Sequence, residues 1–289
     1  MLLAYAVVCV YLATHLTAAR NPPIGTPADV GLVYEPVAFQ SELDHIPLRG
    51  WYLPSSGTRA IILAHGLDGN RWNSNNWLAQ LVPVFVHDGF DVLTFDQRAH
   101  GESEGEHVGL GTLERGDVRA AVHLVEQRGV QAGHIGLFGQ SFGAATALNS
   151  TGAISDVAGV ASDSAFADAR ERLNFEIHRL TGLPPIFAPG VGLAASGLYG
   201  IDLSVTPEKA MAQIAPRPVL LIHGDADTRI PVENAYRLKA ASTNPNVELW
   251  IVPGAGHTGS YDVAPELYTQ KIVTFFERAL DASAVLTDS

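Results

Sequence analysis

The pentapeptide Gly139-Gln140-Ser141-Phe142-Gly143 has the pattern G-x-S-x-G. It follows a short apolar run over 134–138 and precedes an Ala-rich stretch over 144–148. This order predicts a strand, a sharp turn and a helix, with the hydroxyl of Ser141 exposed near the helix N-terminus. A five-residue pattern also arises by chance, as a Gly-rich turn with an incidental Ser. The strand before it and the helix after it favour a nucleophile.

Apolar runs on both sides of this motif predict a sheet that is buried on both faces. Strands are expected at 33–39, 48–53, 60–64, 90–95, 157–161, 218–222 and 247–252, and helices at 77–87 (broken or restarted at Pro83), 113–128 and 265–280. The first two strands read as an antiparallel hairpin. The later alternation of strand and helix indicates one doubly wound α/β domain, over 32–282, with a mostly parallel sheet.

Two segments depart from this alternation. Prolines at 22, 23 and 27 predict a linker without helix over 21–31. Residues 166–214 combine helical stretches (168–180 and 191–199) with Pro184-Pro185 and Pro189-Gly190. We interpret this segment as a helical cap over the carboxyl ends of the strands.

Composition excludes several classes of function. The 289 residues are 47% hydrophobic, and the formal net charge of −12 comes without any Lys/Arg-rich run. Nucleic acid is therefore not expected as a partner, because phosphate contacts need clustered positive charge. The single Cys cannot form an intramolecular disulfide, and the 11 His show no H-E-x-x-H pattern. We expect no metal and no organic cofactor.

The N-terminal segment over 1–20 is hydrophobic, with no Asp, Glu, Lys or Arg before Arg20 and His15 as its only strongly polar residue. Its length is close to the roughly 20 residues of a membrane-spanning helix. A transmembrane anchor is the favoured interpretation, with membrane association through residues 1–19. A signal peptide fits the small residues at 17–19 but lacks a positive start. A helix packed on the domain is the third alternative. The protein is thus expected to be membrane-anchored or exported, and a cytoplasmic location stays open.

A Ser hydroxyl needs a base within hydrogen-bond reach, and the base needs a carboxylate that fixes its tautomer. The loop after 218–222 carries Asp225 and Asp227, and the loop after 247–252 carries His257. The order Ser, Asp, His is that of α/β-hydrolases. Loops that follow parallel strands meet at one edge of the sheet, so these side chains can converge.

Several motifs together resemble the α/β-hydrolase family, specifically its bacterial serine hydrolases, from about Val33 to Leu280. They are His65-Gly66, Asp96 with Arg98 and His100-Gly101, the G-x-S-x-G pentapeptide, His223 to Pro231, and Gly256-His257. Ala99 departs from the Gly that relatives often carry in that turn.

The resemblance implies that Ser141 is the nucleophile, His257 the general base and Asp227 the acid. Asp225 is the second choice for the acid and Asp163 the third, each with a turn or cap role as the alternative. It also implies an oxyanion hole from the backbone N–H groups of Leu67 and Phe142.

The expected function is a serine hydrolase that cleaves carboxylic esters through an acyl-enzyme. Peptidase, acyl-peptide hydrolase, thioesterase and amidase activities are compatible with the same residues, and a catalytically silent binding protein is the non-enzyme alternative. His65 is expected to order the oxyanion loop, and Asp96, Arg98 and His100 to bond within their turn. The cap aromatics Phe175, Phe187 and Tyr199 are expected to line an acyl pocket or to pack in the cap.

Overall fold

The computed structural model describes residues 2–15, 21–73 and 76–287. In this part of the chain eight strands form one sheet in the order β1-β2-β4-β3-β5-β6-β7-β8. Only the pairs β1·β2 and β2·β4 are antiparallel, and the other neighbours are parallel. The strands are β1 (Glu35–Gln40), β2 (Pro47–Leu53), β3 (Arg59–Ala64), β4 (Phe90–Asp96), β5 (Ile135–Gln140), β6 (Val157–Asp163), β7 (Val219–Gly224) and β8 (Val247–Val252).

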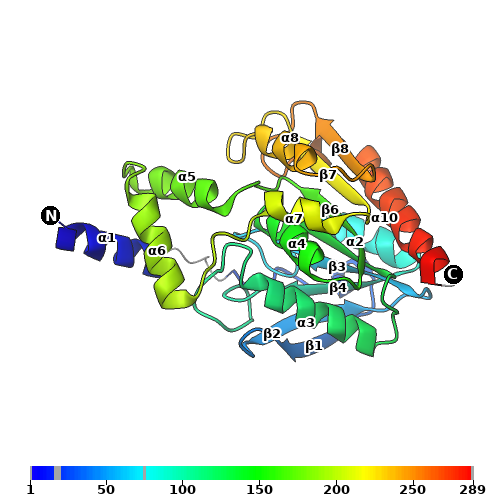
Figure 1. The fold of residues 1–289 in the computed structure, drawn as a ribbon. Coiled ribbons are helices and arrows are strands. Elements are labelled where there is room, and N and C mark those ends of the chain that lie inside the picture. The colour runs from blue at the N-terminus through cyan, green and yellow to red at the C-terminus, as the bar shows by residue number, and fades with distance from the viewer. Residues whose placement is uncertain (1, 16–20, 74–75, 288–289) are drawn as a thin grey trace.

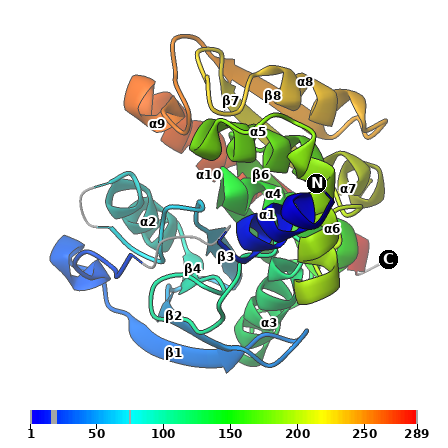
Figure 2. The same ribbon diagram turned by 90° about the vertical axis from the view of Figure 1, so that its left-hand side faces the viewer.

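Helices cover both faces of the sheet, as Figures 1 and 2 show. Ile62 of β3 joins the core under α3 (Glu114–Gln127), α4 (Phe142–Ala153), α7 (Pro207–Ile214) and α8 (Glu233–Ala240). Ile61 and Leu63 of the same strand join the core under α2 (Leu78–His87) and α10 (Pro265–Thr287). Side chains alternate between the faces of a strand, so a strand covered on both sides must be apolar throughout. The predicted doubly wound fold with an antiparallel start is confirmed.

Some predicted boundaries were wrong. α2 runs through Pro83 without interruption, although a proline removes one backbone hydrogen bond. The apolar side of α2 faces the core, and that packing outweighs the lost bond. β6 and β7 each extend two residues beyond the predicted ends, to Asp163 and Gly224. α8 had no counterpart among the predicted helices.

The expected linker over 21–31 contains a short 3-10 helix, η1 (Pro27–Val30), which corrects the prediction of no helix there. Pro27 stands at its first position, where the missing N–H costs no hydrogen bond. The segment also contacts the domain. Ile24 N donates to Trp72 O, and Asn70 Nδ2 donates to Asn21 O and Pro22 O.

Between β6 and β7 the chain forms α5 (Ala169–Thr181), α6 (Phe187–Tyr199) and α7. Helices α5 and α6 stand beside the sheet together with α1 (Leu2–His15), and we call these three the outer helices (Figure 1). Helix α6 includes Pro189-Gly190, which the sequence pattern had placed before the helix. Pro189 lies in the first turn, where proline is tolerated.

Helix α1 is the described part of the predicted anchor, and its 14 residues extend about 21 Å at 1.5 Å per residue. Cys9, Leu12 and Ala13 are buried against the other outer helices. Within the described residues, no helix combines the length and the apolar character needed to cross a membrane. The remainder of the predicted anchor, residues 1 and 16–20, lies outside the described residues.

Candidate active site

Ser141 occupies the turn between β5 and α4, with φ 55° and ψ −117°. This is a backbone conformation that non-glycine residues rarely adopt. Two glycines permit the turn. A Cβ on Gly139 would lie 2.2 Å from the carbonyl oxygen of Gly143, and one on Gly143 would lie 2.0 Å from that of Ala64. Ser141 N donates to Asp163 O at 2.7 Å. The turn thus fixes the hydroxyl at the carboxyl end of β5.

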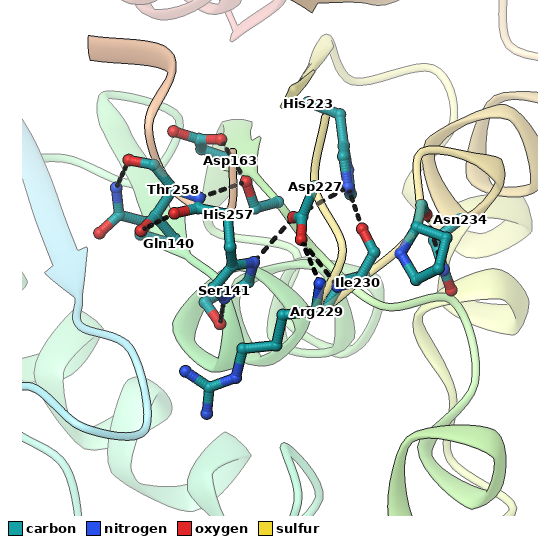
Figure 3. Close-up of polar contacts among 12 residues, drawn as sticks. Gln140, Ser141, Asp163, His223, Asp227, Arg229, Ile230, Asn234, His257 and Thr258 are labelled. Carbon is teal, nitrogen blue, oxygen red and sulfur yellow. Dashed lines mark hydrogen bonds and ion pairs between the residues drawn. The ribbon is translucent and has the colours of Figure 1, made fainter. Parts of the chain in front are cut away.

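The structure brings the three predicted triad residues together (Figure 3). Ser141 Oγ lies 2.8 Å from His257 Nε2, and His257 Nδ1 lies 2.7 Å from Asp227 Oδ2. A carboxylate can only accept, so Nδ1 of His257 carries the proton. In the neutral ring, Nε2 is then free to accept the proton of Ser141. This tautomer is the one that general-base catalysis requires.

Asp227 is held as a carboxylate. Its side chain is fully buried, and Oδ1 accepts from the backbone N–H groups of Arg229 (2.9 Å) and Ile230 (2.8 Å). Burial alone would raise the pKa of Asp227. Hydrogen bonds from His223 and His257 and from the backbone of Ile230 outweigh it and keep the pKa well below its usual range. His223 Nε2 also lies 2.7 Å from Ile230 O, which ties the acid loop to β7.

The two alternative acids have other partners. Asp225 Oδ1 accepts from Gly254 N at 2.6 Å, which joins its loop to the loop after β8. Asp163 is fully buried, and it accepts from Tyr268 Oη at 2.8 Å and from Ser164 Oγ at 2.9 Å. Ser164 Oγ in turn accepts from Thr258 N at 3.2 Å. Asp163 therefore supports the loop that carries His257, and the structure shows no contact between its carboxylate and the imidazole.

Leu67 lies on the loop after β3, which two histidines hold. Nδ1 of His65 lies 2.8 Å from Gly66 O, and its Nε2 accepts from Gln97 N at 3.1 Å. Burial, together with the neighbouring His100, lowers the pKa of His65 to about 3, so this ring is neutral. Both nitrogens are engaged, and His65 orders the loop as expected.

His100 contacts the same loop from the turn after β4. Its Nε2 lies 2.8 Å from Leu67 O and its Nδ1 2.7 Å from Arg98 O. The expectation that this turn bonds mainly within itself was wrong for Arg98. That side chain reaches Asp117 on α3 and Asp44 after β1. The turn is a buried connection between the sheet, α3 and the loop that carries Leu67.

A cavity of about 290 Å³ opens at Ser141. Leu67 and Phe142, the two predicted oxyanion residues, line it beside Ser141. Phe142 begins α4, where the first N–H groups of a helix have no partner within the helix. Apolar residues line one part of the cavity, and charged residues from α5 and the acid loop line another. They are Asp68, Val108, Leu110, Phe166, Arg172, Leu173, Glu176, Arg179, Leu180 and Arg229, with His15 of α1 at the margin.

Comparison with known proteins agrees with this fold. A family model described as alpha/beta hydrolase fold matches residues 59–187. The Escherichia coli K12 protein YfhR is 32% identical over 257 residues, covering 86% of this chain and 82% of YfhR. The Bacillus subtilis protein YqkD is 30% identical over 242 residues, covering 82% of this chain and 77% of YqkD.

This chain belongs to the alpha/beta hydrolase family. Among solved structures, the Pyrococcus furiosus esterase PF2001 is similar to this hydrolase, with a TM-score of 0.76 and 25% identity. The match covers 92% of this chain and 98% of the esterase.

Sequence reasoning missed the charged part of the hydrolase cavity. Arg172 and Glu176 stand four residues apart on α5, and so share one face of that helix. That spacing was visible in the sequence, but nothing in it shows that this face is turned toward Ser141. The aromatics expected to line the pocket do not line this cavity. Phe187 stacks on Tyr5 and Tyr199 lies against His107 with a tilt of 37°, which supports the packing interpretation for these two. Phe175 is 38% exposed, with Arg172 over its ring.

Proposed function

We propose that this alpha/beta hydrolase is a serine hydrolase of carboxylic esters, with Ser141 as nucleophile, His257 as general base and Asp227 as the acid. The observation that carries the proposal is the continuous hydrogen-bonded path from Ser141 Oγ through the imidazole to Asp227. The low pKa of Asp227 supports it, because an ionised acid holds His257 in the productive tautomer. The similarity to the esterase PF2001 supports esters as the substrate class.

In the proposed reaction, Ser141 Oγ attacks the ester carbonyl while His257 Nε2 takes its proton. The imidazolium then protonates the departing alcohol, and an acyl-enzyme remains on Ser141. Water attacks this acyl group with the same imidazole as base, which releases the acid and restores Ser141. The N–H groups of Leu67 and Phe142 are proposed to stabilise the oxyanion in both steps. The cavity at Ser141 would hold the substrate.

The test is hydrolysis of 4-nitrophenyl esters, from acetyl to palmitoyl, by the full chain and its Ser141→Ala variant. We expect the variant to lose at least about 10³-fold in kcat, because no other group in the proposed mechanism replaces the nucleophile. The cavity of about 290 Å³ is at the small end of ligand pockets, which span ~300–1,000 Å³. Short acyl chains should therefore be preferred.

A fluorophosphonate probe supplies the control. The wild-type chain should be labelled and Ser141→Ala should not, while circular dichroism and melting temperature stay the same for both. Turnover by Ser141→Ala at the wild-type rate would refute the assignment. A wild-type chain that is neither labelled nor active on any ester would favour a binding protein.

A further inference from the structure

The cavity at Ser141 has a cationic side. Arg172, Arg179 and Arg229 line it together with two carboxylates, Glu176 and Asp68. The chain as a whole is strongly acidic, with 18 basic against 30 acidic residues. Three guanidinium groups against two carboxylates therefore give the cavity a charge opposite to that of the molecule.

Two of these arginines share a single carboxylate, so one positive charge on this pair is not neutralised. Arg172 and Arg179 both bind Glu176, one to each carboxylate oxygen, and the side chains of Arg172 and Glu176 are almost fully buried. Arg172 Nη1 also donates to the backbone oxygen of Arg229 at 2.8 Å. Glu176 is thus shared by two cations and cannot also neutralise a third.

Arg229 is the arginine that can still bind a further carboxylate. Nη1 binds Asp68 Oδ2 at 2.9 Å, but the Asp68 side chain is 66% exposed. Nε is buried and has no hydrogen-bond partner among the described residues, since Glu176 Oε1 is 3.7 Å away. The electrostatics agree: burial, and then the like charges of Arg229 and Arg179, lower the pKa of Arg172 to about 10. Positive charge is in local excess.

Arg229 is also held close to Asp227 and Ser141. It follows Asp227 by two residues, and its backbone N–H donates to the Asp227 carboxylate at 2.9 Å. Figure 3 shows its side chain extending from the acid loop to below Ser141. Its placement thus depends on the same loop that positions the acid.

We propose that Arg229 is a specificity-determining residue that binds a carboxylate on the substrate, so that the preferred substrates are acidic carboxylic esters. This inference rests on the proposed role of Ser141. The planar fork of a guanidinium fits a carboxylate with two parallel hydrogen bonds. A substrate carboxylate would take the place of Asp68, whose exposed side chain returns to water at little cost.

Two matched pairs of esters test the proposal with the full chain. On the acyl side, the mono-4-nitrophenyl ester of adipic acid is compared with 4-nitrophenyl hexanoate, which has the same six-carbon chain without the charge. On the alcohol side, 4-acetoxybenzoate is compared with its methyl ester. In one of the two pairs, we expect kcat/KM for the acidic ester to be about tenfold higher than for its neutral partner. A charge-assisted hydrogen bond to the substrate accounts for a factor of this size.

Variants assign the preference to Arg229. In Arg229→Gln, kcat/KM for the acidic ester should fall about tenfold, whereas kcat/KM for the neutral ester should change less than about twofold. Arg229→Lys should retain part of the preference, because it keeps the charge without the fork. Asp68→Asn, which removes the competing carboxylate, should increase the preference. Arg278→Gln is the matched control. That arginine pairs with Glu248 on the surface and does not line the cavity.

Failure of the inference about Arg229 can be distinguished from failure of the proposed esterase function. Equal loss on both esters of a pair in Arg229→Gln would mean that Arg229 only supports the acid loop, and would overturn the inference. Wild-type hydrolysis of all four esters without an acidic preference would also overturn it, while leaving the esterase proposal intact. Absence of hydrolysis of every ester would contradict the proposed function itself.

Discussion

At the scale of single residues, the strained backbone of Ser141 depends on two glycines, at positions whose surroundings leave no room for a methyl group. A Cβ on Gly143 would approach the backbone oxygens of Ala64 and His65 rather than flexible side-chain ends. The strain is stored at the proposed nucleophile, as is common at active sites. The two flanking glycines are therefore requirements of the turn as well as parts of a sequence motif.

Replacing Gly143 with Ala should destabilise the protein severely. The added methyl group would lie 2.0 Å from Ala64 O, so β3 and α4 would have to separate. We expect the free energy of unfolding in urea to fall by more than about 4 kcal/mol, as for other severe core defects.

Gly197→Ala is the matched control for this substitution. Gly197 is exposed on α6, and a Cβ added there would have no neighbour within 4 Å, so alanine should stabilise by up to about 1 kcal/mol. Similar unfolding curves for the two variants would contradict the explanation by steric clash.

At the scale of elements, the first turn of α3 contains Glu114, a fully buried carboxyl. It accepts from Gly109 N and from Gly111 N at 2.9 Å, and so fixes the loop that places Leu110 in the cavity. Burial raises the pKa of Glu114 to about 7, against the opposing effect of Arg98. The start of this helix therefore holds a group that titrates near neutral pH.

Stability should depend on pH through Glu114 with a defined sign. Its pKa in the folded state, about 7, is above the unfolded value of ~4.3. The folded state thus holds more protons between these values, and the contribution of Glu114 to stability falls as pH rises from about 4 to 7. The loss amounts to at most about 4 kcal/mol.

The measurement compares the wild-type chain with Glu114→Gln in urea at pH 5 and pH 8. The free energy of unfolding of the wild type, relative to the variant, should be lower at pH 8. A difference that does not change between the two pH values would show that Glu114 does not titrate in this range.

Elements whose burial is uniform could be predicted from the sequence. β3 is apolar from Ala60 to Ala64 because both of its faces are covered, and its loop could be placed at the same edge of the sheet as that of Ser141 from the parallel order alone. The positions of the triad residues followed from this logic, since all three follow strands that end at one edge. Their assignment as catalytic residues stays a prediction.

Other elements could not be predicted because their structure depends on tertiary packing. The pattern of α8 is short and mostly polar, and only Ala235 and Leu238 are buried. The charged face of α5 belongs to the cavity only because the chain folds back over the strand ends. The pairing of Arg229 with Asp68 likewise joins two loops that are far apart in the sequence.

At the scale of the whole molecule, the N-terminal helix α1 packs on α6, which is far from it in the sequence. Tyr5 Oη donates to Ile186 O at 2.8 Å, and the Tyr5 ring stacks on Phe187 with centroids 5.2 Å apart. Gly190 permits this close approach, since a Cβ there would lie 2.5 Å from Cys9 Sγ. His15, at the other end of α1, lines the cavity. Docking of α1 thus completes one margin of the cavity.

Substituting Gly190 with Val should undock α1 without unfolding the domain, because the clash is with α1 alone. With that margin opened, the preference among 4-nitrophenyl esters should shift toward longer acyl chains. Gly197→Val changes the same helix at a position without neighbours and should leave the preference unchanged. An identical chain-length profile for both variants would contradict a role of α1 at the cavity.

The contact between α1 and α6 also encloses the single cysteine of the chain, which is 3% exposed. A thiol reagent can therefore react at one place only, and only while α1 is detached. The rate of that reaction would therefore report directly on how often the N-terminal helix detaches. It could be followed during turnover, with no dye or tag added to the protein.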